Sequence, residues 1–291
     1  LIAPRAGGTA PGDHYRAAGG AVLFVAADAR ASPGWFLMLS VEQLGCSRGG
    51  RQVLRDLTFD LHAGEVIAVL GTNGAGKSTL LAALCGELVV DTGRVQLAGR
   101  NLDEWTAGER ARRLAVLPQQ SELAFPFRVE EVVALGRMPH ATGLQQDLAI
   151  CADAMAAADV THLSQRSYLT LSGGERQRVH LARVLAQVWE VGEGGCLLLD
   201  EPTASLDLAH QRLIMQQARA MASRGLSVLV VLHDLNLAAA FADRVLLLHE
   251  GRLDALGTPW QVLQADHIER VFGVAVQVQR HPQHDCPLVI L

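Results

Sequence analysis

The spacing of apolar residues divides the chain into short buried strands and amphipathic helices. Several runs are apolar without alternation, which predicts strands buried on both faces of a parallel sheet. These runs lie at residues 66–70, 116–120, 196–199, 228–232 and 245–248. Helical spacing predicts helices just after residue 77, at 206–223 and at 235–242. Strands that alternate with helices in this way indicate an α/β core with a parallel sheet.

Two other parts of the chain have different patterns. Residues 39–61 and 89–102 contain short apolar stretches separated by turns at 48–51, 91–93 and 98–101, which predicts a small antiparallel sheet. Residues 129–135, residues 147–158 and a segment that starts near Ser172 have helical patterns.

These patterns predict one domain over residues 38–291. Its core and β-subdomain are expected at about 38–118 and 189–291, with a helical subdomain inserted at about 119–188. Residues 1–37 are rich in Ala, Gly and Pro and precede Met38, so we expect them to be an extension outside the fold.

The first chemical signal is the segment at residues 71–79, G-T-N-G-A-G-K-S-T, between a predicted strand and a predicted helix. It fits the pattern G-x-x-x-x-G-K-[ST] of loops whose backbone N–H groups face a phosphate. Lys77 is expected to reach the β- and γ-phosphates, and the Ser78 hydroxyl to bind Mg²⁺. The residues expected to bind nucleotide here are Gly71, Thr72, Asn73, Gly74, Ala75, Gly76, Lys77, Ser78 and Thr79.

A second signal is the start of the helix near residue 172, L-S-G-G-E-R-Q-R. Ser172 and Glu175 have the spacing of a capping box. Gly173 and Gly174 lower the stability of the first helical turn, and capping of the helix gives no reason for glycine at these positions. Close approach of a phosphate to the exposed N–H groups would explain both glycines.

The third signal is the pair Asp200-Glu201 after the apolar run at 196–199. A carboxylate at the end of a buried strand beside a phosphate loop is the usual partner of Mg²⁺ in such ATPases, so Asp200 suits the metal. Glu201 would face the γ-phosphate and polarise the attacking water as a general base.

Composition excludes several other classes. The 291 residues carry a net charge of −5, whereas nucleic-acid binding calls for a basic patch. The five cysteines are scattered and odd in number, which favours a reducing cytoplasm over a disulfide framework. No run approaches the roughly 18 apolar residues of a membrane span.

Taken together, these segments resemble the ATP-binding cassette (ABC) family of transporter ATPases over about residues 39–255, because every diagnostic block is present in order. The resemblance implies a P-loop NTPase fold with a RecA-like core, ATP and Mg²⁺ as cofactors, and ATP hydrolysis coupled to transport. It makes Glu201 the catalytic glutamate and His233 a switch histidine at the γ-phosphate. Gln119 matches the glutamine that senses Mg²⁺ and the attacking water, and the adjacent Gln120 is the alternative for that role.

The resemblance also assigns the remaining site residues. Ser78, Gln119 and Asp200 would bind Mg²⁺. Residues 171–177 match the family signature, so that Ser172, Gly173 and Gly174 would contact nucleotide, and Asp207 lies in a loop that crosses a dimer interface. Two copies of the chain would then enclose two ATP molecules head to tail on a membrane permease dimer, at the cytoplasmic face of the inner membrane.

Residues 125–137 are similar to the ATPases of importers for iron chelates, haem and vitamin B12. Residues 138–140 and C-terminal segments at 271–274, 281–283 and 286–288 look closest to the haemin importer ATPases, which implies uptake of haem delivered by a periplasmic or surface haem-binding protein. A siderophore or vitamin B12 importer is the alternative. A non-transport ABC ATPase acting on nucleic acid or the ribosome is another. Against it, Lys77 and Ser172 are only 95 positions apart (172 − 77), and the chain holds one cassette.

Two features leave alternatives open. Arg48 stands about where many family members carry an aromatic ring that stacks on adenine, and a guanidinium can stack on a base too. Cys286-Pro287, with His281 and His284 nearby, resembles a short motif of haem-regulated proteins. Spacing alone is weak evidence for a haem or metal site, and a surface tail near the end of the last strand is the favoured interpretation.

Overall fold

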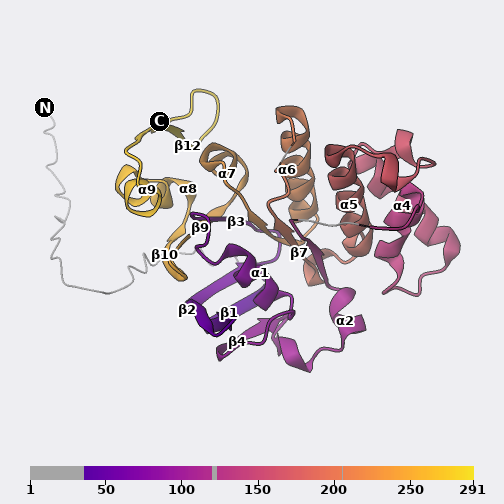
Figure 1. The fold of residues 1–291 in the computed structure, drawn as a ribbon, viewed down its shortest axis with the longest axis horizontal. Coiled ribbons are helices and arrows are strands. Elements are labelled where there is room, and N and C mark those ends of the chain that lie inside the picture. The colour runs from indigo at the N-terminus through magenta and orange to yellow at the C-terminus, as the bar shows by residue number, and fades with distance from the viewer. Residues whose placement is uncertain (1–35, 120–122, 205) are drawn as a thin grey trace, which may run out of the picture.

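The core of the protein is a six-stranded sheet with helices on both sides, shown in Figure 1. The structure is a computed structural model that describes residues 36–119, 123–204 and 206–291. The strands follow the order β10-β9-β3-β8-β7-β6, in which β10 is antiparallel to β9 and the others are parallel. They are β3 (Val66–Leu70), β6 (Leu114–Leu117), β7 (Cys196–Asp200), β8 (Ser227–Val231), β9 (Arg244–His249) and β10 (Arg252–Gly257). The predicted α/β core with a parallel sheet is confirmed.

Each central strand is buried on both faces. In β3, Val66, Ala68 and Leu70 pack into one apolar cluster, whereas Ile67 and Val69 pack into a second cluster on the opposite face. Successive side chains of a strand point to opposite faces, so an apolar run without alternation is what two cores require.

The second cluster lies beneath a separate antiparallel sheet of order β2-β1-β4-β5. Its strands are β1 (Leu37–Arg48), β2 (Arg51–His62), β4 (Thr92–Leu97) and β5 (Arg100–Asn101). α1 (Lys77–Leu84) packs between the two sheets. β1 begins one residue before the expected start of the domain at residue 38.

Several local predictions for this part of the chain were wrong. Thr92 and Gly93 start β4 instead of forming a turn, and the hairpin turn is confined to Ala98 and Gly99. The edge strand β6 begins two residues before residue 116 and ends at Leu117, because Pro118 cannot continue the ladder.

The predicted helical insertion forms the right-hand side of Figure 1. It contains α3 (Val129–Ala134), α4 (Leu144–Ala157) and α5 (Gly173–Val188), with the short α2 (Ala107–Ala111) before it. Ser172 caps α5, and both hydrogen bonds of the capping box with Glu175 are present. The core then continues through α6 (Leu208–Ser223) and α7 (Leu235–Phe241). α6 starts two residues later than predicted, because Asp207 is its N-cap.

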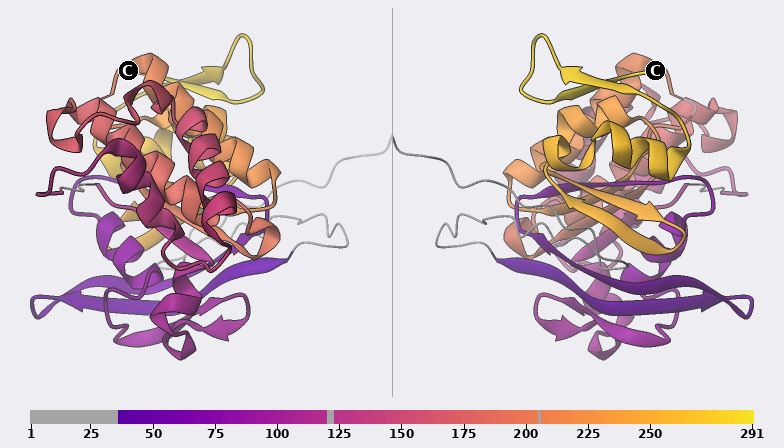
Figure 2. Two further views of the ribbon diagram at one scale, coloured as in Figure 1. Left: turned by 90° about the vertical axis from the view of Figure 1, so that its right-hand side faces the viewer. Right: turned by 90° about the vertical axis from the view of Figure 1, so that its left-hand side faces the viewer.

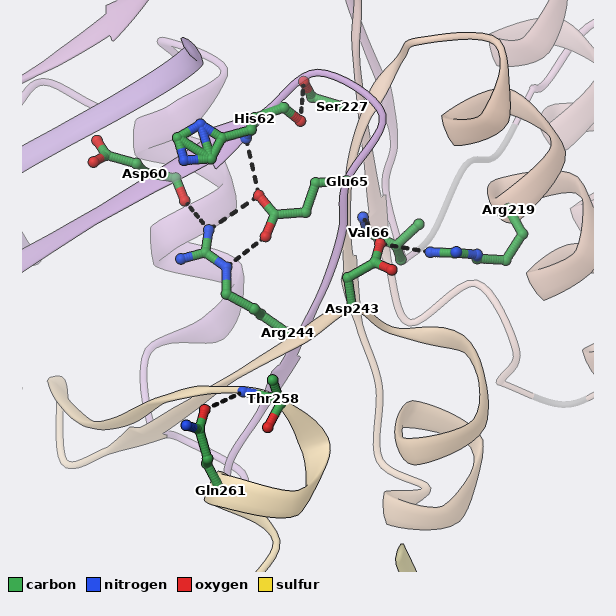
Figure 3. A network of polar contacts seen from close by, with 10 residues as sticks. All are labelled: Asp60, His62, Glu65, Val66, Arg219, Ser227, Asp243, Arg244, Thr258 and Gln261. Carbon is green, nitrogen blue, oxygen red and sulfur yellow. Dashed lines mark hydrogen bonds and ion pairs between the residues drawn. The ribbon is translucent and has the colours of Figure 1, made fainter. Parts of the chain in front are cut away.

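A buried ion-pair network joins the two sheets at the end of β3 away from the phosphate loop (Figure 3). Glu65 is 4% exposed, and its carboxylate binds the Arg244 guanidinium and accepts a hydrogen bond of 2.9 Å from the backbone N–H of His62. Arg244 also donates to the Asp60 carbonyl oxygen at 2.6 Å. Because His62 and Asp60 belong to β2 and Arg244 to β9, this network fixes the antiparallel sheet on the core.

The C-terminal region is a folded unit, and the interpretation of its end as a surface tail was wrong. After β10 come α8 (Pro259–Val262), α9 (Ala265–Phe272) and a hairpin of β11 (Gln277–Arg280) and β12 (Pro287–Ile290). Cys286 and Val289 are 6% and 7% exposed and belong to the main apolar cluster. Figure 2 shows the hairpin lying over the core at the top of both views.

No helix in the described part of the chain combines the length and the apolar character that crossing a bilayer demands.

Candidate active site

The candidate chemical groups lie at the carboxyl ends of four neighbouring strands. Residues 71–79 follow β3, His233 follows β8, and Gln119 follows β6. Asp200 ends β7, and Glu201 comes directly after it. These strands are adjacent in the order β3-β8-β7-β6. The carboxyl edge of an open parallel sheet is where ligands bind in α/β folds, and here the sheet order alone brings the predicted groups together.

The phosphate loop lines an open cavity of about 360 Å³ at this edge. Its lining consists of Val53, Asn73, Gly74, Gly76, Lys77, Ser78, Thr79 and Glu201. Lys77 folds over the loop and donates hydrogen bonds to the carbonyl oxygens of Gly71 at 2.9 Å and Thr72 at 3.1 Å. Burial lowers the pKa of Lys77, and the charges of Glu201 and Asp200 oppose this shift.

Glycine is required in the loop for two reasons. Gly74 and Gly76 have φ angles of +80° and +107°, which side chains with a Cβ rarely adopt. At Gly76 a Cβ would also lie 2.7 Å from the Leu54 Cδ2 atom of β2. The antiparallel sheet therefore packs directly against the loop and helps to fix its shape.

The loop has a further support that the sequence did not reveal. Gly251, in the turn between β9 and β10, donates a hydrogen bond of 3.0 Å to the Ala75 carbonyl oxygen, and its own carbonyl accepts one of 2.8 Å from Arg55. A Cβ on Gly71 would overlap the Leu248 carbonyl oxygen. The end of β9 and its turn thus lie against the phosphate loop, although roughly 175 residues separate Gly251 from Ala75 in the chain.

Asp200 has the environment of a metal ligand. It is 8% exposed, and its Oδ1 atom has no hydrogen-bond partner within the described structure. Burial raises the pKa of its carboxyl group, while a hydrogen bond with Ser78 opposes the shift. A buried carboxylate oxygen without a partner is costly, and a hard cation with oxygen ligands would satisfy it. The donor set of Ser78 and Asp200 therefore fits Mg²⁺.

Glu201 is held by both of its carboxylate oxygens. Gln119 Nε2 donates to Oε2 at 2.6 Å, and His233 Nε2 lies 2.6 Å from Oε1. The backbone of Glu201 has φ +48°, a left-handed conformation that is uncommon for a residue other than glycine. Such strain clusters at functional sites, and here it turns the side chain towards the phosphate cavity, whose lining it joins.

The other predicted residues lie apart from this group. Ser172, Gly173, Gly174 and Asp207 are not among the described residues that line the cavity. Gly174 packs instead against Leu206, whose Cδ2 would be 3.1 Å from an added Cβ, and Asp207 accepts hydrogen bonds from His210. Gln120 lies outside the described residues.

Arg48 is exposed at the end of β1, next to the β1–β2 turn, and its stacking on a base stays a prediction. Val53 of β2, which the sequence did not single out, is the residue of this sheet that lines the cavity.

The haem-motif interpretation of Cys286-Pro287 does not fit the structure. Cys286 is buried, and burial raises the pKa of its thiol, which disfavours the thiolate needed to bind iron. His281 accepts hydrogen bonds at Nδ1 from the backbone N–H groups of Gln283 and His284. Over residues 36–119, 123–204 and 206–291, no cluster of three or more His, Cys, Asp or Glu side chains is placed to hold a metal ion.

Comparisons of the chain with known proteins point to one family. Residues 54–204 match the family described as "ABC transporter". The hemin import ATP-binding protein HmuV of Pseudomonas entomophila (strain L48) is 58% identical over 253 residues, covering 87% of this chain and 99% of that protein. The protein of that name from Gloeobacter violaceus is 54% identical over 257 residues, covering 87% of this chain and 94% of its own length.

Solved structures agree with the architecture. An inward-facing metal-chelate type ABC transporter is similar with a TM-score of 0.72 and 28% identity, covering 87% of this chain and 96% of that chain. The ATP-binding subunit of an ABC transporter follows with a TM-score of 0.69 and 25% identity, covering 82% and 94%.

Proposed function

Because this chain belongs to the ABC transporter family, we propose that it is the ATP-hydrolysing subunit of an importer that takes up haem through a separate membrane permease. The choice of haem as the substrate rests on one observation. The chain is 58% identical, over nearly the whole length of the relative, to a protein named for hemin import. The chain is an ABC ATPase, and ATP binding follows from its family.

The residues divide the chemistry of hydrolysis among them. Lys77 and the backbone N–H groups of residues 71–79 bind the β- and γ-phosphates. Ser78, Asp200 and Gln119 would hold Mg²⁺, which would neutralise charge on the phosphate oxygens. Glu201 accepts the proton of the attacking water, and His233 contacts the γ-phosphate. The hydrogen bond from Gln119 and the close contact with His233 support this assignment, because they keep the Glu201 carboxylate at the cavity in one orientation.

One copy of the chain holds only half of the site. We infer that Ser172, Gly173 and Gly174 bind the γ-phosphate on a second copy, and that Asp207 lies at the interface between the copies. The N-terminus of the 16-residue α5 favours a negative charge, its first N–H groups have no partner within the helix, and Gly173 in the first turn is exposed. The position of these residues away from the chain's own phosphate cavity supports a role towards a partner.

The assembly follows from the same inference. Two copies pack head to tail on a permease dimer at the cytoplasmic face of the inner membrane, and a periplasmic or surface haem-binding protein delivers the substrate. Exposed apolar side chains of the helical subdomain support contact with another protein, since Phe125, Met138 and Leu144 are 68%, 76% and 76% exposed.

The test is uptake by the assembled importer. The chain is produced with its permease in membrane vesicles loaded with Mg-ATP, and transport of haemin, a ferric siderophore and cobalamin is compared. Haemin alone should be transported, and Glu201→Gln should abolish its transport. Transport of the siderophore or of cobalamin in place of haemin would refute the substrate. If the chain purified with ribosomes or DNA and not with the permease, the transport function itself would be refuted.

A further inference from the structure

The C-terminal hairpin of β11 and β12 is attached to the helix that follows His233. The Asn236 side chain, in the first turn of α7, donates from Nδ2 to the Val289 carbonyl oxygen at 3.0 Å. The Val289 N–H in turn donates to Asn236 Oδ1 at 2.7 Å. One amide side chain thus satisfies both backbone groups of one residue of β12, as a neighbouring strand would.

The pairing of the hairpin leaves these two groups available. In an antiparallel pair, hydrogen-bonded and non-hydrogen-bonded residue pairs alternate. His281 N–H donates to the Cys286 carbonyl oxygen at 2.9 Å, and Val289 lies opposite Val278 three pairs further along the same register. Val289 is therefore in a non-bonded pair, and its N–H and C=O point away from β11. Pro287 occupies another non-bonded position, where its missing N–H costs nothing.

The same turn of α7 is bonded on its other side to the residue next to His233. Asp234 is the N-cap of α7, and its Oδ1 accepts hydrogen bonds from the backbone N–H groups of Asn236 at 2.8 Å and Leu237 at 3.0 Å. His233 directly precedes Asp234 and contacts Glu201. A continuous set of bonds therefore runs from β12 through Asn236 and Asp234 to the position of His233.

α7 is short and depends on its neighbours for its position. It has seven residues, far fewer than a helix needs to be stable alone in water, so its position depends on tertiary contacts. Its fully buried side chains are only Ala238 and Ala239, while Leu235, Leu237 and Phe241 are partly buried. The hairpin packs into the same apolar cluster through Cys286 and Val289, and the Asn236 hydrogen bonds tie the first turn of α7 to it.

We propose that Asn236 is a positioning residue for hydrolysis: it fastens the first turn of α7 to the C-terminal hairpin and thereby holds His233 at Glu201 and the γ-phosphate. The proposal rests on the proposed role of His233. It gives the folded C-terminal segment, which lies outside the matched family region at 54–204, a function in catalysis.

The test is a double-mutant cycle in the full chain, measured as steady-state Mg-ATP hydrolysis. Asn236→Ala removes both hydrogen bonds to Val289, and we expect kcat to fall about tenfold while KM for ATP changes less than twofold. In the His233→Ala background, the same substitution should change the residual kcat less than twofold, because it acts through His233. Ile290→Ala, in the same strand and with no bond to α7, is the matched control.

Each outcome decides a separate point. If Asn236→Ala keeps kcat within twofold, or lowers it equally in both backgrounds, the positioning role is refuted. If His233→Ala alone leaves turnover unchanged, the proposed role of His233 fails independently of Asn236. Should Asn236→Ala not fold, the isosteric Asn236→Asp keeps the acceptor for the Val289 N–H but loses the donor to the Val289 carbonyl oxygen, and it must show the same non-additive loss of kcat.

Discussion

The contact of Gly251 with the phosphate loop allows a sharp test of how the loop is supported. Gly251 has φ +76°, and a Cβ at this position would overlap the Val53 carbonyl oxygen of β2 at less than 3.0 Å. An alanine there must adopt a left-handed conformation, which costs about 1–2 kcal/mol, and must also displace the turn from β2, at a cost of about 1–3 kcal/mol. The displacement weakens the hydrogen bonds of Gly251 with Ala75 and Arg55, each worth roughly 1 kcal/mol.

Gly99 provides the matched control. Its φ of +74° is nearly the same, but a Cβ there would meet nothing within 4 Å. Gly99→Ala thus carries only the conformational cost, and the difference between the two variants measures the close approach. We expect Gly251→Ala to lose about 2–5 kcal/mol of unfolding free energy and Gly99→Ala about 1–2 kcal/mol.

Thermal unfolding and ATP titration separate the two effects. At roughly 2–4 °C per kcal/mol, Gly251→Ala should have the clearly lower Tm, and its affinity for ATP should fall at least about tenfold because the Ala75 carbonyl loses its partner. Gly99→Ala should bind ATP normally. Equal Tm shifts together with unchanged ATP affinity in Gly251→Ala would show that the β9–β10 turn does not support the loop.

Three further predictions concern single carboxylates. Glu201→Gln should bind ATP but hydrolyse it at least about 100-fold more slowly and accumulate ATP-bound dimers in size-exclusion chromatography; near-normal turnover would remove Glu201 from its role. Asp200→Asn should abolish hydrolysis, yet it should raise the Tm of the nucleotide-free chain at pH 7. Burial raises the pKa of the Asp200 carboxyl group, so above that pKa the ionised carboxylate lowers the stability of the folded chain, and asparagine removes this charge. This Tm gain should shrink as the pH falls below the raised pKa, and a gain independent of pH would contradict the explanation. Glu65→Ala should destabilise the chain by about 3 kcal/mol in urea unfolding, since it leaves Arg244 without its buried partner, whereas Asp103→Ala on the exposed surface should not.

The parts of the site that depend on local sequence were predictable. The phosphate loop, the capped start of α5 and the Asp200-Glu201 pair each combine a short motif with a buried strand or a capping signal in the same few residues. The sheet was also predictable, because strands that need two apolar faces carry unbroken apolar runs such as Val66–Leu70.

What could not be predicted depends on contacts between distant segments. Nothing in the sequence around Gly251 indicates that its N–H reaches Ala75, since a glycine after a strand reads as an ordinary turn. The C-terminal hairpin was missed because β11 has the sequence Q-V-Q-R, with little apolar content, and its partner β12 is held largely by α7 and the core. The turn at 91–93 was misplaced because Gly93 has φ +78° within a strand, where its close approach to the Glu42 and Gln43 carbonyl oxygens excludes a side chain.

The strands that carry the residues of the candidate active site differ in how many neighbouring strands hold them in place. The strands that carry the phosphate loop, His233 and Asp200 each have a neighbour on both sides, whereas β6, which carries Gln119, ends the order and has β7 alone beside it among the described strands. Amide groups at a sheet edge open with a smaller free energy than those in the centre, so hydrogen exchange should be fastest in β6 among these four. Gln119 is therefore the component that can detach from Glu201 while the rest of the site stays assembled.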